Sequence, residues 1–282
     1  MVTLGGCLIV VTAILVGFTM AGGHMAALMH PSEVITIGGA SLGALIIMSP
    51  KRVLTDLLRC VLQVMKGSPY NRRTYVELLQ LLYGVTRLAR RDGLLALESQ
   101  LGNEHDCPLF QKYPRITGNH HAQRFLYNAL VMIPDSKDPE QMRGALEEEI
   151  QVVEREHHAA VGVLLKTADA LPGFGIVAAV LGIVVTMQAI DGPASEVGHK
   201  VGAALVGTFL GILLSYGFFA PMAGRMEFLG EAEVTCFRVI TSAAVAISFG
   251  ESPREVVTRA CRLVGSDCRP SRTELQEIFR EE

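Results

Sequence analysis

The sequence predicts an all-α, polytopic membrane protein with four transmembrane helices and a large helical cytoplasmic loop. Three observations lead to this fold class: an excess of apolar residues, four long uncharged runs, and the confinement of charge to the segments between and after them. Half of the 282 residues are apolar and only 19% are charged, and the mean hydropathy is +0.35. This apolar excess is too large for an ordinary soluble domain of this length.

Four apolar runs define the expected spans, at residues 8–20, 35–48, 170–190 and 201–224. About 20 helical residues cross a hydrocarbon core of ~30 Å. The third and fourth runs are therefore long enough, and the first is long enough when extended towards Met1, because no charge precedes Glu33. The second run is short, so a buried or half-inserted helix is an alternative to a full span there. A signal peptide would carry basic residues before its apolar run. The first run has none before it, so we interpret it as an uncleaved span.

The basic residues indicate the orientation. Of the 25 Lys and Arg residues, 16 lie between Lys51 and Lys166, eight lie from Arg225 onward, and only Lys200 lies elsewhere. The positive-inside rule then places the large loop, the tail and both termini in the cytoplasm. The expected division is spans 1 and 2 in residues 1–50, a cytoplasmic helical domain in 51–168, spans 3 and 4 in 169–224, and a cytoplasmic helical tail in 225–282.

The cytoplasmic segments show helical periodicity and no strand alternation. Apolar residues recur at helical spacing through 75–101, where Gly93 bends or breaks the helix. A late helix is expected after Ser271, because Ser271 and Glu274 have the spacing of a capping box. Further helices are expected at 115–133, 142–165 and 226–246.

Several functional classes are not supported by any motif. The chain has no phosphate-binding G-x-x-x-x-G-K-[ST] loop, and its six cysteines lack the spacing of a zinc site. The single Glu-x-x-His motif at Glu154 is half of what a di-iron bundle needs. Nothing resembles the basic footprint of a nucleic-acid binder. We therefore expect no enzyme activity, no cofactor, no metal and no nucleic-acid partner.

Small residues are concentrated in the third and fourth spans. Gly207 and Gly211 form a small-xxx-small pattern that allows close approach of helices, within the chain or between copies of it. Neither span contains a titratable residue, whereas ion carriers usually place such groups inside the membrane. If protons cross here, we expect another chain to supply the carboxylate. Asp169, just before the third span, either exchanges ions at the cytoplasmic mouth or is a solvated flanking charge.

Three sequence blocks carry a family resemblance: GASLGA at residues 39–44, LPGFGIVAAVLG at 171–182, and VGTFLGILLSYGFFAP at 206–221. With these blocks the chain resembles the MotA-type stator subunit of the bacterial flagellar motor, in the MotA/TolQ/ExbB ion-channel superfamily. The similarity extends over most of the chain, including residues 90–98 and the tail at 269–271.

The resemblance implies a multi-pass protein of the bacterial inner membrane, embedded in lipid, with protons as the coupling ion. It implies a homo-oligomer, a pentamer, around the membrane helices of a MotB-type dimer anchored to peptidoglycan. A membrane aspartate of that partner takes up and releases the ion, and the cytoplasmic loop then acts on a FliG-type rotor protein. The energy source is the membrane potential, about 2.3 kcal/mol per charge per 100 mV, with any pH gradient added.

Rotor contact is implied for Arg90 and Glu98, which match the charges of the family. Arg87, Arg90 and Arg91 have i, i+3, i+4 spacing and form one basic patch, and Glu98 shares their face if the helix continues through Gly93. An ordinary solvated face is the alternative.

Conformational coupling is implied for Pro172 and Pro221, at the cytoplasmic ends of the third and fourth spans. A helix start at Pro172 and a packing kink at Pro221 are the alternatives. The ion pathway is implied to include Thr208 and Ala179, together with Asp169. Ala179 stands where sodium-driven relatives carry a threonine, which favours protons; Thr208 could instead bond to its own helix.

Three other classes of membrane protein are alternatives to a stator subunit. TolQ/ExbB-like proton channels that energise envelope transport have a similar small-residue pore but three spans, and they lack the 90–98 segment. A substrate transporter predicts inverted repeats or broken spans with polar binding groups, and the sequence has neither. A purely structural membrane scaffold would not need ion flow.

Overall fold

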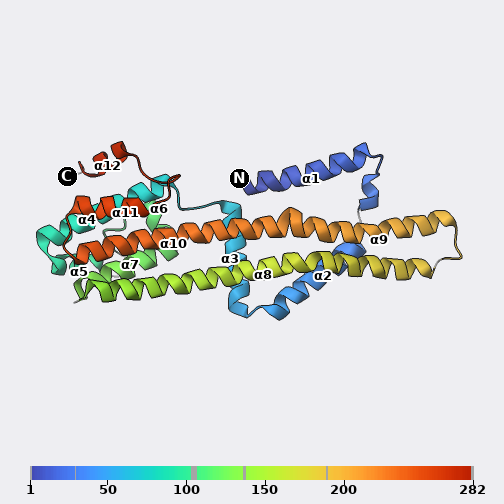
Figure 1. The fold of residues 1–282 in the computed structure, drawn as a ribbon, viewed down its shortest axis with the longest axis horizontal. Coiled ribbons are helices and arrows are strands. Elements are labelled where there is room, and N and C mark those ends of the chain that lie inside the picture. The colour runs from blue at the N-terminus through green and yellow to red at the C-terminus, as the bar shows by residue number, and fades with distance from the viewer. Residues whose placement is uncertain (1, 29, 103–106, 136–137, 189, 281–282) are drawn as a thin grey trace. The chain divides into compact units, whose positions relative to one another are not determined.

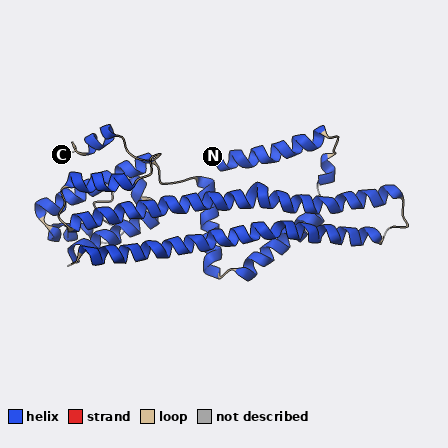
Figure 2. Cartoon of the chain, viewed as in Figure 1, coloured by secondary structure: helices blue, strands red, loops and turns tan. Residues whose placement is uncertain are grey.

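In the computed structural model every element of the described residues is a helix (Figures 1 and 2), which confirms the all-α fold class. The structure describes residues 2–28, 30–102, 107–135, 138–188 and 190–280. The elements in chain order are α1 (Val2–Met20), η1 (Met25–Leu28), α2 (Pro31–Met48), α3 (Lys51–Lys66), α4 (Arg72–Asp92), α5 (Leu94–Leu101), α6 (Pro114–Thr117), α7 (His120–Asp135), α8 (Pro139–Met187), α9 (Ala194–Leu214), η2 (Ser215–Phe219), α10 (Ala220–Ser248), α11 (Pro253–Leu263) and α12 (Arg272–Ile278).

Four helical segments are long and apolar enough to cross a membrane, which confirms the number of expected spans. They are Thr3–Met20, Pro31–Met48, a window within Pro139–Met187, and a window within Ala194–Ser248. The second run forms an 18-residue helix, so the sequence pattern underestimated its length because Pro31 begins the helix before the apolar residues start. The residues at which the chain enters and leaves the membrane remain a prediction.

The first of two compact units contains Met1–Gly67 and Glu156–Phe228. Within it the C-terminal half of α8 and α9 lie side by side (Figure 1), and α2 packs against them through a small core of Ile37, Leu171 and Ala178. His157, from the motif that contains Glu154, has its ring Nε2 2.8 Å from the carbonyl oxygen of Met226. That contact ties α8 to α10 and gives this histidine a packing role.

The second unit contains Ser68–Arg155 and Leu229–Glu282. Its core is formed by the buried faces of α4, α7, α10 and α11, and the rings of Phe125 and Phe237 stack at its centre with centroids 4.2 Å apart. An aromatic pair of this kind adds about 0.5–1.5 kcal/mol to the area that it buries. The segment between the second and third spans therefore forms its core together with the tail of the chain.

Some helix boundaries follow the sequence and others differ from the expected ones. Residues 75–101 form two helices, as Gly93 predicted: its φ of +86° ends α4 and begins α5. The expected helix at 115–133 is likewise divided into α6 and α7 near Gly118. The expected helix at 142–165 is instead part of the 49-residue α8, which continues through the third span.

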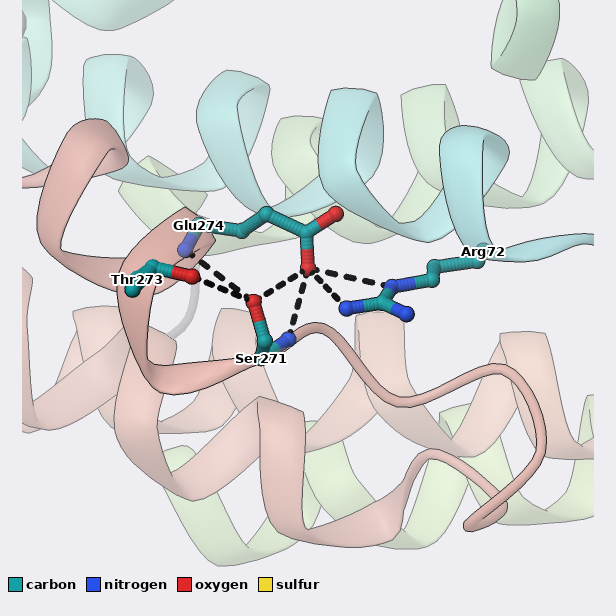
Figure 3. Close-up of polar contacts among 4 residues, drawn as sticks. All are labelled: Arg72, Ser271, Thr273 and Glu274. Carbon is teal, nitrogen blue, oxygen red and sulfur yellow. Dashed lines mark hydrogen bonds and ion pairs between the residues drawn. The ribbon is translucent and has the colours of Figure 1, made fainter.

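The capping box at Ser271 is confirmed and also attaches α12 to α4 (Figure 3). The Ser271 hydroxyl accepts a bond from the Glu274 backbone N–H at 3.3 Å, and Glu274 Oε2 accepts from the Ser271 backbone N–H at 2.7 Å and from Arg72 Nε at 3.0 Å. These bonds, first that from the Ser271 backbone and then that from Arg72, lower the pKa of Glu274 to about 2. A second capping box, Ser252 with Glu255, begins α11 and was not anticipated.

Candidate functional site

The contact between α8 and α9 depends on glycines that leave no room for a side chain. A Cβ added at Gly211 would lie 2.6 Å from the carbonyl oxygen of Leu171, and one added at Gly175 would lie 2.9 Å from the carbonyl oxygen of Gly207. The nearest atoms are backbone, so they cannot rotate away. The pattern of Gly207 and Gly211 therefore serves packing within this chain, one of the two possibilities that the sequence left open.

The two ion-pathway candidates of the spans lie in this same contact. The Cα of Thr208 lies 3.2 Å from a Cβ added at Gly175, and the backbone nitrogen of Ala179 lies 3.3 Å from a Cβ added at Gly207. Within the described part of the chain, no acceptor takes a hydrogen bond from the Thr208 hydroxyl. The hydroxyl of Thr186, by contrast, donates to the carbonyl oxygen of Gly182 at 2.8 Å and is fully buried.

Glu33 is a site residue that the sequence reasoning missed. We expected the carboxylate to come entirely from another chain, because spans three and four contain none. The structure places Glu33, from α2, against α9: its side chain is 7% exposed, and Oε2 lies 2.7 Å from a Cβ added at Gly207. The chain therefore carries a carboxylate of its own at the start of α2, beside α9, and the expectation that another chain supplies the ion-carrying carboxylate stays a prediction. The sequence did offer one signal for this residue, because Glu33 is the third residue of an otherwise apolar helix.

The two prolines lie within continuous helical segments. Pro172 is inside α8, so the interpretation of Pro172 as a helix start is wrong. Pro221 is the second residue of α10 and directly follows η2, a π-helical turn in which the N–H of Ala220 bonds to the carbonyl oxygen of Ser215. A π turn inside a helix marks a local widening and is frequent at functional sites. Asp169 is exposed on α8, one turn before Pro172.

The charged residues implied in rotor contact are all exposed on the second unit: Arg87, Arg90 and Arg91 on α4, and Glu98 on α5. Arg91 forms an ion pair with Asp92 at 2.8 Å, and its hydrogen bonds hold the pKa of the Asp92 carboxyl below the usual range. Glu98 was expected on the same helix face as Arg91 if one helix continued through Gly93. The helix does not continue, because α4 ends at Asp92 and a separate helix, α5, begins after Gly93.

A cavity of about 420 Å³ adds two residues to this charged surface. It is lined by Arg87, Arg91, Lys112 and Gln100 among other residues, so three cations from two segments face one hollow. Lys112 was not singled out from the sequence, because only the fold brings residue 112 beside α4.

Comparison with known proteins agrees with this architecture. Residues 4–93 match the family model described as Motility protein A N-terminal, and residues 117–238 match that of the MotA/TolQ/ExbB proton channel family. Motility protein A of Salmonella typhimurium is 32% identical over 281 residues, which cover 99% of this chain and 95% of the relative. The chemotaxis protein LafT of Vibrio parahaemolyticus is 32% identical over 278 residues, covering 98% of each chain.

Two solved structures share the fold over nearly the full length. The MotAB structure of C. jejuni superposes with a TM-score of 0.79 at 25% identity, covering 96% of this chain and 98% of that one. The flagellar MotAB stator complex of Bacillus subtilis superposes with a TM-score of 0.74 at 26% identity, covering 90% and 92%. With 32% identity to a motility protein A across almost all of both sequences, this chain belongs to the MotA-type members of the MotA/TolQ/ExbB proton channel family.

Proposed function

We propose that this chain, a stator subunit of the bacterial flagellar motor, conducts protons across the inner membrane together with a MotB-type partner dimer anchored to peptidoglycan. The proposal includes torque on a FliG-type rotor protein, a pentamer of this chain, both termini in the cytoplasm, and no enzymatic activity or cofactor. The observation that carries it is the close α8–α9 contact, in which Thr208 lies beside glycines that allow the two helices to approach closely.

The helices that form this contact also reach into the second unit. α8 is one unbroken helix from Pro139 to Met187, and α9 leads through η2 into α10. η2 and the two prolines interrupt regular α-helical bonding along these segments, and they are the places at which we propose that the helices bend when ion flow drives movement.

Exposed apolar side chains on the spans provide a surface for the proposed assembly. Large side chains remain exposed on both helices of the contact, including Ile176, Val180 and Val184 on α8 and Leu205 and Ile212 on α9. Contiguous apolar surface of this extent calls for lipid, further copies, or partner helices. The envelope-transport alternative of the TolQ/ExbB type is not favoured, because the Motility protein A N-terminal match covers α1 to α4.

Sodium is not expected to support movement. Sodium needs several oxygen ligands, and in the α8–α9 contact Thr208 offers a hydroxyl whereas Ala179 offers none. In cells that carry this chain and its native partner as their sole stator, swimming should persist in sodium-free medium and collapse when a protonophore is added. Speed that rises with sodium and survives the protonophore would instead assign sodium as the coupling ion.

Reversal of the exposed charges is expected to slow or stop swimming at unchanged protein level. Exposed pairs contribute only about 0–1 kcal/mol each, so neutralising Arg90 or Glu98 alone should be mild. The informative variant is Arg90→Glu combined with Glu98→Lys, measured by swimming speed and by immunoblot. The matched control reverses two exposed charges elsewhere on the same unit, Arg73→Glu with Glu277→Lys. Normal swimming of the first pair, together with no effect of charge reversal on the rotor, would reject the rotor-contact assignment.

A further inference from the structure

Glu33 lies in the helix contact of the first unit, within a candidate membrane span. The residue is 7% exposed, and the titratable group nearest to it along the chain is His30, directly before α2, with which its carboxylate interacts electrostatically. Acidic residues inside membrane-spanning segments are rare and commonly mark ion or proton pathways. The position of this carboxylate therefore points to proton binding.

The carboxylate lies beside Gly207 of α9 and Ala178 of α8, away from the ends at which these two helices are connected. Gly207, whose added Cβ would be 2.7 Å from Glu33 Oε2, is 13 residues from the start of α9 at Ala194. Ala178, whose Cβ is 3.1 Å from the same position, is nine residues before the end of α8 at Met187. At 1.5 Å per residue these separations are about 20 Å and about 14 Å. Glu33 is thus far from the outer ends of α8 and α9, although it lies in the first turn of its own helix, α2.

A cavity lies along the first half of α9 and beside His30, and Glu33 is not among its lining residues. It has a volume of about 620 Å³ and follows α9 from Gly198 to Phe209. Its titratable lining groups are His30 and His199, whose ring centroids lie 6.3 Å apart. The backbone N–H of Glu33 donates to the carbonyl oxygen of His30 at 3.2 Å, so His30 lies one turn from the carboxylate.

The other charges near this path lie at its outer end. On α9, Lys200 and Glu196 form an exposed ion pair at 3.0 Å, which neutralises both next to His199. α8 contributes no titratable side chain between residues 170 and 187, and α1 contributes only Cys7. Glu33 is the titratable group of α2, and His30 is the residue directly before that helix. His199 and His30 are therefore the titratable groups of the cavity from which a proton could reach Glu33.

We propose that Glu33 is a proton-binding site of this chain, loaded from the outer face through His199 and His30. In the loading step a proton passes from an imidazolium N–H to a carboxylate oxygen, which leaves a neutral imidazole and a neutral carboxylic acid. Loading removes the buried charge from the contact with Gly207, next to Thr208, and release restores it. This inference deepens the proposed function and rests on protons as the coupling ion.

The test separates proton binding from proton flow. The complex of this chain with its native partner is purified, reconstituted in lipid bilayers, and examined by pH-difference infrared spectroscopy and by proton uptake into vesicles. The variants are Glu33→Gln, Glu33→Asp and the control Glu196→Gln, which removes an exposed acid at the outer end of α9. We expect Glu33→Gln to lack one protonated-carboxyl band and to lower the rate of proton uptake about tenfold. Glu33→Asp should shift that band and recover most of the uptake, and Glu196→Gln should change neither.

The outcomes are distinguishable. A wild-type complex that shows the Glu33 band but takes up no protons contradicts proton flow and leaves the binding site in place. An infrared difference spectrum that is the same in wild type and Glu33→Gln overturns the binding site, whatever the flow. If Glu33→Gln does not accumulate in membranes, an unshifted band in Glu33→Asp overturns it equally.

Discussion

Replacement of Gly211 by alanine is expected to abolish swimming and to reduce sharply the amount of assembled protein in the membrane. The added Cβ would lie 2.6 Å from the carbonyl oxygen of Leu171 and 2.9 Å from the Cα of Gly175. Both neighbours are backbone atoms of α8, so the two helices must separate. Overpacking typically costs about 1–3 kcal/mol even where side chains can adjust, and here none can. Immunoblots of membrane fractions, co-purification with the partner and thermal unfolding of the purified complex measure the loss.

Gly202→Ala is the matched control, because it lies on the same helix and has no atom within 4 Å of an added Cβ. It should assemble normally if the damage comes from packing within the chain. Normal assembly and swimming of Gly211→Ala would show that α8 and α9 do not approach as described. Damage from Gly202→Ala as well would point to a contact between copies.

Leucine at Pro221 or Pro172 is expected to remove most of the torque while the assembled protein remains at the wild-type level. Leucine supplies the N–H that proline lacks, so the chain after η2 can regain regular α-helical bonding and lose its point of bending. Because Pro172 interrupts the bonding of α8, the same reasoning applies there. Rotation of tethered cells at known load measures torque, and co-purification with the partner measures assembly.

Pro139→Leu provides the control for these variants, since Pro139 is the first residue of α8, where an N–H has no partner inside the helix. It should leave torque unchanged. Disappearance of Pro172→Leu or Pro221→Leu from the membrane would favour the packing kink over the coupling role.

Several features were determined by the sequence itself, because they depend on neighbours along the chain. Burial of about 20 apolar residues in lipid requires no tertiary partner, so the four spans follow from composition alone. The capping box of Ser271 and Glu274 is equally local, because its two bonds join residues three apart. The three family blocks were recognisable for the same reason.

Only the tertiary structure decided the features that depend on residues distant in sequence. It assigned Gly207 and Gly211 to contact with α8 of the same chain, and it brought Glu33 to α9 and Lys112 to α4. It also continued α8 through Pro172, because packing along a long helix compensates for the bond that proline removes, whereas Gly93 ended α4. Local propensity is worth about 1–3 kcal/mol per residue at glycine or proline, so the sum of distant contacts determines whether such a residue is tolerated within a helix or ends it.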